Sequence, residues 1–132
     1  MPMPRTPVIL IADRSRLAAN LYRLIFTPIG ANLLVRSRAT DILDHLKRGA
    51  AVDIIMVSTN ALGPQPEDVI SRIESDARAS GLPKIFLCRE TKGEELQRGR
   101  LAGLSNSRVV TRPFDPDELA KLVKVSVKGA GR

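Results

Sequence analysis

Short apolar runs alternate with segments of helical period along the chain, and this alternation restricts the fold more than any other feature of the sequence. Residues 8–12 form a continuous apolar run, which is typical of a parallel strand buried on both faces. Similar strands are predicted at residues 33–35, 53–57, 84–88 and 108–111. A helical segment follows each of them. The repeated strand–helix unit predicts an α/β fold with a five-stranded parallel sheet, strand order 2-1-3-4-5, and helices on both faces.

The first predicted helix is amphipathic and the second is short. Leu17, Leu21, Leu24 and Ile25 recur at helical spacing, so we expect all four to face the core. In the second helix, Thr40 precedes the apolar positions and is expected to cap the N-terminus. Both helices would then cover the sheet with their apolar stripes.

The later helices carry signals of unequal strength. One helix is expected to continue as far as Gly81, with Ala77 among its inward residues. Residues 93–104 have only a thin apolar stripe and predict a weak helix. Asp115 is expected to cap the last helix, because Pro suits the first turn and Glu118 completes the spacing of a capping box.

The chain of 132 residues fits one domain, with a core over about residues 6–125 and a frayed tail over 126–132. No apolar run approaches the roughly 20 residues that a membrane span needs, and the start lacks the features of a secretory signal. Cys88 and His45 are the only cysteine and histidine, which excludes an internal disulfide and a His/Cys metal site within one chain. We therefore expect a reduced, cytoplasmic setting without contact with a membrane.

The chain is strongly basic, with 21 Lys and Arg against 14 Asp and Glu, which gives a net charge of +7. The basic residues do not form a solid block of the kind that marks a nucleic-acid tail. Aromatic residues, which would stack on single-stranded bases, make up only 3% and lie in segments predicted to be core. We expect no nucleic-acid partner, and the charge instead favours an acidic protein partner.

A functional site is expected where the carboxyl ends of the first and third strands meet, because ligands of such sheets bind at the point where the strand order reverses. The first strand is followed by Asp13 and Arg14, and the third by Ser58, Thr59 and Asn60. These polar residues are the first candidates for a functional pocket.

Three segments resemble the receiver domain of two-component response regulators. Residues 112–119 (RPFDPDEL) are close to the family's Lys-Pro-Phe-x-x-x-x-Leu after the fifth strand. Residues 53–57 with the following Leu62-Gly63 loop resemble the third strand and the loop after the phosphoacceptor. Residues 9–13 and the turn at 14–16 resemble the acidic-pair turn after the first strand.

The resemblance covers nearly the whole predicted core and implies the flavodoxin-like receiver fold. It also implies a cis peptide bond before Pro113, with a structural role. A protein of this family is expected to act in phosphorelay signal transduction and not as an enzyme.

The sequence departs from the family where phosphorylation chemistry would occur. Ser58 occupies the position where the family has its phosphoacceptor aspartate. A hydroxyl is a weak nucleophile without an activating base. The acidic pair is replaced by Asp13 and Arg14, so one carboxylate of the family's three remains. Mg²⁺ prefers carboxylate oxygens, and an arginine repels it. We expect neither Mg²⁺ nor another cofactor to bind.

The residues that act in switching also differ. Cys88, a weak hydrogen-bond donor, stands where the family has a hydroxyl at the end of the fourth strand. Val109 replaces the aromatic side chain that moves on activation, and Arg112 replaces the lysine with a different geometry. These substitutions indicate a receiver that no longer runs the aspartyl-phosphate cycle.

Two hypotheses remain for this degenerate pocket. Asp13 and Glu90 would pair with Arg14 and Arg112 and lock the pocket in one state, with the arginines as internal counter-ions. Alternatively, the two arginines would bind an anion, because a guanidinium matches phosphate geometry.

We therefore predict a degenerate response-regulator receiver, or pseudo-receiver, that acts as a phosphorylation-independent protein–protein interaction module. The partner would be another signalling protein or a second copy. The family's docking face, formed by the fourth predicted helix, the fifth strand and the fifth helix, would here include Leu96, Arg100, Leu104, Arg108, Lys121 and Lys124. An atypical receiver that is phosphorylated at a modified site is the main alternative, and a fragment of a longer DNA-binding regulator is a third.

Overall fold

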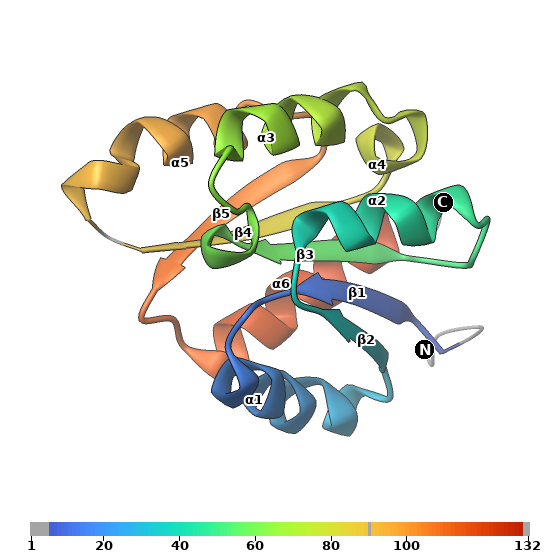
Figure 1. Cartoon of the computed structure of the whole chain (residues 1–132). Helices are drawn as coiled ribbons and strands as arrows, with labels where there is room; N and C mark the ends of the chain where they lie inside the picture. The colour runs from blue at the N-terminus through green and yellow to red at the C-terminus, as the bar shows by residue number, and fades with distance from the viewer. Residues whose placement is uncertain (1–5, 90, 131–132) are drawn as a thin grey trace.

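Five parallel strands form the sheet in the computed structural model, which describes residues 6–89 and 91–130 (Figure 1). The strands are β1 (Val8–Ala12), β2 (Asn32–Arg36), β3 (Ile54–Ser58), β4 (Lys84–Arg89) and β5 (Ser107–Arg112). Their order is β2-β1-β3-β4-β5, and every neighbouring pair is parallel. The predicted fold class and strand order are therefore confirmed.

Helices cover both faces of the sheet (Figure 1). The α-helices are α1 (Arg16–Phe26), α2 (Ala39–Lys47), α3 (Pro66–Ser75), α4 (Ala77–Gly81), α5 (Glu95–Ala102) and α6 (Pro116–Ala130), and three short 3-10 helices are η1 (Thr27–Ile29), η2 (Thr59–Ala61) and η3 (Lys92–Glu94). α1 and α6 pack on one face, and α2, α3, α4 and α5 pack on the other. No helix in the described part of the chain is both long and apolar enough to cross a membrane.

The sheet separates two hydrophobic cores, because successive side chains of a strand point to opposite faces. Leu10 and Ala12 of β1 pack toward α2 and α3, whereas Ile9 and Ile11 pack toward α1 and α6. All four side chains are fully buried. Burial on both faces explains why the inner strands are continuous apolar runs in the sequence.

The predicted apolar stripe of α1 is wrong for its three leucines. Leu17 and Leu24 are 82% and 75% exposed, and Leu21 is 38% exposed. The helix instead buries Tyr22 and Phe26 beside Ile25. This rotation places the large aromatic rings in the core and brings the Tyr22 hydroxyl to a buried hydrogen-bond partner, described below.

Two further helix expectations are wrong. α2 begins at Ala39 after Arg38, so Thr40 lies inside the helix and does not cap it. The helix expected to reach Gly81 is divided at Asp76, whose backbone is extended. The Asp76 side chain accepts a hydrogen bond from the Ala79 amide (2.9 Å) and so starts α4 as a separate helix.

The last helix is longer than the sequence indicated. The Asp115 carboxylate accepts a hydrogen bond from the Asp117 amide (2.8 Å), as expected for its N-terminus. At the other end, α6 continues through residues 126–130, which we expected to be a frayed tail. Val127 is buried against α1 and the sheet, and this burial accounts for the additional turn.

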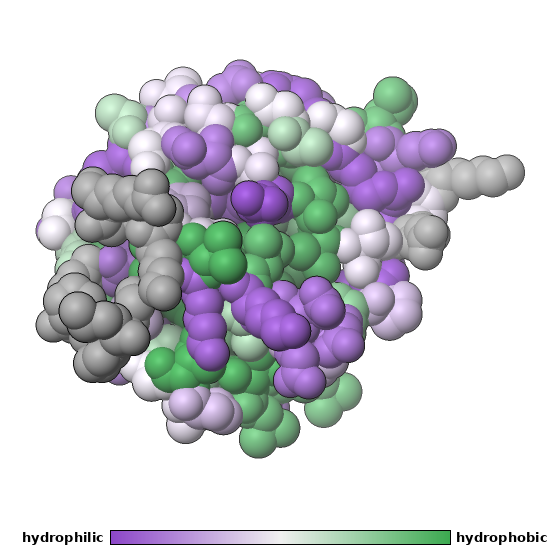
Figure 2. All heavy atoms as spheres, turned by 180° about the vertical axis from the view of Figure 1, so that it is seen from behind, coloured by the Kyte–Doolittle hydropathy of each residue, from purple (hydrophilic) through white to green (hydrophobic). Residues whose placement is uncertain are grey.

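Several hydrophobic side chains remain at the surface. From behind, green hydrophobic groups appear at the centre and the bottom of the view, between purple hydrophilic groups (Figure 2). The large hydrophobic residues exposed in the described structure are Leu17, Leu21, Leu24, Leu96 and Val125. Three of them belong to α1.

Candidate functional site

Asp13 is the centre of a buried hydrogen-bond network at the carboxyl end of β1. One carboxylate oxygen, Oδ2, accepts hydrogen bonds from the Tyr22 hydroxyl (2.6 Å) and from Arg112 Nη2 (2.8 Å). The other oxygen, Oδ1, accepts from the Asn60 side-chain amide (2.8 Å) and the Ser15 backbone amide (2.9 Å). Only 4% of Asp13 is exposed, so both oxygens are satisfied by the protein itself.

The network joins elements that are distant in the sequence. Arg112, at the end of β5, also donates to the Tyr22 hydroxyl (2.7 Å), which closes a triangle with Asp13. Asn60 accepts a hydrogen bond from the Arg14 backbone amide (2.9 Å) and thereby links the turn after β1 to the turn after β3. The hydroxyl of Ser15 caps α1 by accepting from the Ala18 amide, and α1 in turn positions Tyr22.

The charges in this network are fixed at neutral pH. Burial alone would raise the pKa of Asp13, but hydrogen bonds from Tyr22, Ser15, Asn60 and Arg112 hold it below its ordinary value. Burial is the main cause of the raised pKa of Tyr22, and the hydrogen bond to Asp13 raises this pKa further. Burial would lower the pKa of Arg112, but Tyr22 and Asp13 together raise it. The centre is therefore an ion pair with a neutral tyrosine.

The two arginines expected in the pocket differ in role. Arg112 contacts Asp13, as the lock hypothesis requires. Arg14 is exposed, and its guanidinium forms no ion pair with another described residue. Glu90, the second carboxylate of that hypothesis, lies outside the described residues. Of the ion pairs that the lock hypothesis requires, the described residues form only the one between Arg112 and Asp13.

Ser58 and Cys88 are both buried in the sheet near this edge. Ser58 is the last residue of β3 and is 2% exposed. Cys88 on β4 is fully buried in the core under α2 and α3, and burial raises the pKa of its thiol to about 11. Val109 packs against the same core, and the Arg112–Pro113 peptide bond is cis, as the resemblance implied. Cys88 thus lies in the environment of a core thiol rather than a reactive one.

Sequence reasoning missed Tyr22 and Glu94, and it named Thr59 without identifying its partner. The Thr59 hydroxyl donates to the Glu94 carboxylate (2.8 Å), which also accepts from the Arg89 backbone amide (3.3 Å). Tyr22 had a recognisable signal, because a buried tyrosine needs a partner for its hydroxyl and Asp13 is near in the chain. The pair of Thr59 and Glu94 had none, because the two residues meet only through the fold.

The carboxylate oxygens of Asp13 at this edge already accept hydrogen bonds within the protein. The oxygens of Asp13 are occupied by cationic and neutral donors of the protein, and Ser58 supplies no carboxylate. Mg²⁺ requires oxygen ligands in near-octahedral geometry, usually with one or two carboxylates. Among the described residues, no group of three or more His, Cys, Asp or Glu side chains is placed to hold a metal ion.

The expected docking face is only partly available. Leu96 on α5 is 91% exposed, and Arg108, Lys121 and Lys124 are also exposed. Leu104 is buried in the core, which contradicts its assignment to this surface.

Arg100 is engaged within the chain. Its guanidinium pairs with two carboxylates of α3, at 3.4 Å from Glu67 and 3.2 Å from Glu74. It therefore connects α5 to α3 and is less free for a partner than the sequence indicated.

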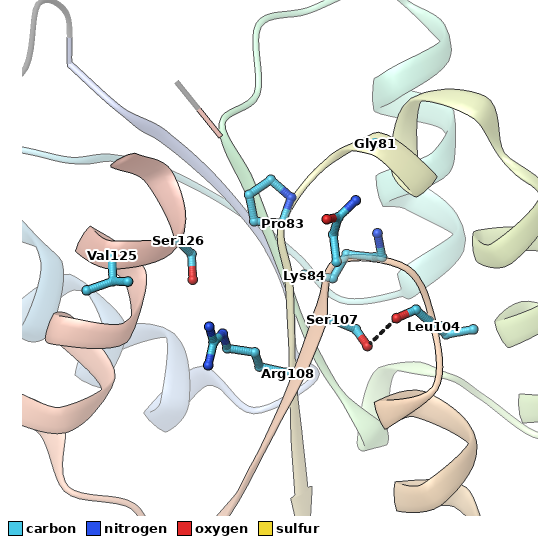
Figure 3. A pocket seen from close by; sticks show the side chains of 9 residues that line it. Gly81, Pro83, Lys84, Leu104, Ser107, Arg108, Val125 and Ser126 are labelled. Carbon is cyan, nitrogen blue, oxygen red and sulfur yellow. Dashed lines mark hydrogen bonds between the residues drawn. The ribbon is translucent and has the colours of Figure 1, made fainter. Parts of the chain in front are cut away.

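Arg108 lies beside an open pocket at the amino ends of β4 and β5. The pocket has a volume of about 580 Å³, and Arg108 points across it toward Val125 and Ser126 of α6 (Figure 3). The hydroxyl of Ser107, another lining residue, donates to the Leu104 carbonyl (2.8 Å). This pocket is at the opposite end of the sheet from Asp13.

No protein-family model matches the chain, and no curated protein matches its sequence. Solved structures do. The signal receiver domain of an HD domain-containing protein from Pseudomonas fluorescens is 17% identical, with a TM-score of 0.79 over 96% of this chain and 98% of its own. A response regulator receiver protein from Sinorhizobium medicae is 19% identical, with a TM-score of 0.72 over 97% and 99%. A response regulator from Thermotoga maritima is 18% identical, with a TM-score of 0.72 over 94% and 99%.

These identities are low, whereas the coverage is nearly complete in both directions. The agreement therefore concerns the arrangement of the whole chain and not the residues of its pocket. The chain has the flavodoxin-like fold of the receiver domains of response regulators.

Proposed function

We propose that this protein is a pseudo-receiver that acts in signal transduction as a phosphorylation-independent protein–protein interaction module. One observation carries the proposal: both oxygens of Asp13 are bonded inside the protein, and one of them is paired with Arg112. The positive charge of Arg112 takes the place that a metal ion would need. The site then holds one charge state without an input from phosphorylation.

The chemistry at Ser58 supports the same proposal. A serine hydroxyl attacks phosphorus only when a base removes its proton. His45, the only histidine of the sequence, lies on α2, away from the end of β3 that carries Ser58. Burial of Ser58 disfavours an ionised alkoxide, which supports a neutral hydroxyl over a phosphoacceptor.

The interaction surface that we propose lies on α5, β5 and α6. It combines exposed hydrophobic side chains, Leu96 and Val125, with the exposed cations Arg108, Lys121 and Lys124. Two such cationic faces would repel each other, so an acidic signalling protein fits this surface better than a second copy.

Incubation with acetyl phosphate and Mg²⁺ tests the absence of phosphorylation. We expect the intact mass to remain unchanged, while a receiver with an aspartate phosphoacceptor gains a phosphoryl group under the same conditions. A phosphoryl group on this protein, lost when Ser58→Ala is introduced, would establish the alternative of an atypical phosphorylatable receiver.

Charge reversal tests the interaction surface. Lys121→Glu with Lys124→Glu should abolish cross-linking to partner proteins in cells, because the variant removes the attraction for an acidic surface. Lys47→Glu on α2 serves as the matched control, since it changes an exposed lysine away from α5, β5 and α6. Equal cross-linking in all three proteins would refute this surface without affecting the result with acetyl phosphate.

A further inference from the structure

A second pocket lies beside the Asp13 network, next to α1. It has a volume of about 480 Å³. Small-molecule sites typically have volumes of roughly 300–1,000 Å³. The lining residues come from α1, the end of β4 and the segment after β5, and they are Ala18, Leu21, Tyr22, Arg89, Arg112, Pro113 and Phe114.

Hydrophobic side chains make up most of the wall. Leu21 is 38% exposed, and Phe114 packs partly buried against the core under α1 and α6. The ring of Tyr22 is fully buried beneath them. Ligand sites usually combine such an apolar wall with a few polar groups that fix orientation. The wall can therefore accept the apolar body of a small molecule.

Arg112 supplies one of these polar groups. Its Nη2 donates to Asp13 and Tyr22, but its Nε is buried and has no hydrogen-bond partner among the described residues. The Arg112 side chain as a whole is 28% exposed, so its accessible part, and not the buried Nε, brings positive charge to the pocket.

Arg89 supplies a second positive charge at the pocket. The residue is exposed at the end of β4, and its backbone contacts Glu94 and Arg98. Its guanidinium pairs with no other residue in the described part of the chain. Asp13 already balances Arg112, so Arg89 is the cation of the pocket lining that has no carboxylate partner among the described residues.

We infer that this pocket binds a small amphiphilic carboxylate, a molecule with one carboxylate group and an apolar body such as a short alkyl chain. The carboxylate pairs with Arg89, beside the positive charge of Arg112, while the apolar body lies against Leu21 and Phe114. A guanidinium matches the geometry of a carboxylate closely. The inference does not depend on the proposed function, because neither Ser58 nor the surface on α6 takes part.

Two other occupants fit less well. A second copy of the chain carries the same net charge of +7, which opposes association. An acidic helix of a partner protein would place its side chains over Leu17 and Leu24 of α1, but the two arginines, Arg89 and Arg112, line the pocket and not that surface. The test therefore includes such a helix as a competing outcome.

Three probes separate charge from apolar contact: octanoate, acetate and octan-1-ol, compared at constant ionic strength. Tyr22 is the only tyrosine and tryptophan is absent, so tyrosine fluorescence reports on this pocket directly. NMR shifts of Leu21 and Phe114 give a second readout. We expect octanoate to bind at least about tenfold more tightly than acetate or octan-1-ol, because only octanoate makes both kinds of contact.

Arg89→Gln should weaken octanoate binding by about tenfold, because it removes the cation that pairs with the carboxylate. Arg72→Gln, which changes an exposed arginine on α3 across the sheet, should leave the affinity unchanged. Equal losses in both variants, equal binding of acetate or octan-1-ol, or no saturable binding of octanoate would overturn the inference. So would an acidic amphipathic peptide that displaces octanoate and binds more tightly.

Discussion

At the scale of residues, Asp13 is the centre of the candidate site. In a metal site its oxygens would face an ion, but here Tyr22, Asn60 and Arg112 occupy them. The carboxylate is buried, and a buried charge is tolerated only when it is paired and hydrogen-bonded. Asp13 therefore stabilises this end of the sheet as the hub of four elements.

Removing the charge should be costly. We expect Asp13→Asn to lower the free energy of unfolding by about 3 kcal/mol, because Arg112 loses its buried counter-charge and an NH2 group replaces one of the two acceptor oxygens. Tyr22→Phe deletes one hydroxyl, which donates to Asp13 and accepts from Arg112, and should cost about 2 kcal/mol. Denaturant unfolding measures both, and an Asp13→Asn protein as stable as the wild type would contradict this role.

The same variant predicts a dependence on pH. The pKa of Asp13 in the folded state lies below its ordinary value of 3.8. The stabilisation is therefore present above that pH and is lost as the pH falls through the folded-state pKa. The difference in unfolding free energy between wild type and Asp13→Asn should shrink on acidification below about pH 4.

Lys84 is a second buried ionisable residue, and its partners are backbone carbonyls and not a charged side chain. Its Nζ donates to the backbone carbonyls of Ala79 (2.6 Å), Ser80 (3.3 Å) and Leu82 (2.8 Å), around the end of α4. Burial lowers the pKa of Lys84 from 10.5 to about 8. Between these values the unfolded chain binds more protons than the folded one, so stability rises with pH.

Comparison with Lys84→Met isolates this effect. The unfolding free energy of the wild type relative to Lys84→Met should increase between pH 8 and pH 10.5, the interval between the two pKa values. Parallel titration of both proteins by denaturant unfolding provides the measurement. A constant difference over this interval would show that burial does not lower the pKa of Lys84.

At the scale of elements, the connection between β3 and β4 is divided by a side chain. The backbone of Asp76 is extended between α3 and α4. The Asp76 carboxylate accepts a hydrogen bond from the Ala79 amide. The short helix α4 then ends against the ammonium group of Lys84. Caps at both ends allow a helix of five residues, which would not form in isolation.

We expect Asp76→Ala to cost about 1 kcal/mol of stability through loss of this N-cap. Asp76→Ser keeps an oxygen that can accept from the Ala79 amide and should retain most of the wild-type stability. Hydrogen exchange locates the effect, which should be largest at the amides of α4. Equal behaviour of the alanine and serine variants would argue against capping.

At the scale of the whole molecule, the sheet separates two cores that share only its backbone. Ile42 of α2 is buried on one side and Ile25 of α1 on the other. Side chains without shared neighbours contribute to stability independently.

The two cores should therefore respond additively. Ile42→Val and Ile25→Val each remove one methyl group and should each cost about 1 kcal/mol. The double variant should lose the sum of the two single losses to within about 0.5 kcal/mol. A larger deviation in denaturant unfolding would indicate coupling through the sheet.

The sequence by itself determined the five strands, because burial on both faces leaves continuous apolar runs in the inner ones. The strand order predicted for this repeated strand–helix unit is also the observed one. The sequence also located the start of α6 through Asp115, since a cap is a local signal. It could not determine which side of α1 faces inward: Leu17 and Tyr22 are both apolar enough for the core, and packing of the whole helix decided between them.

The candidate site divides in the same way. The chemical character of Asp13 and Ser58 was visible in the sequence, together with their place at one edge of the sheet. Arg112 was proposed as a partner of Asp13 only through the family resemblance, because it is 99 positions away, and Tyr22 was assigned to the core alone. A hydrogen bond depends on distances of a few tenths of an ångström, and only the tertiary structure brings such groups to that distance.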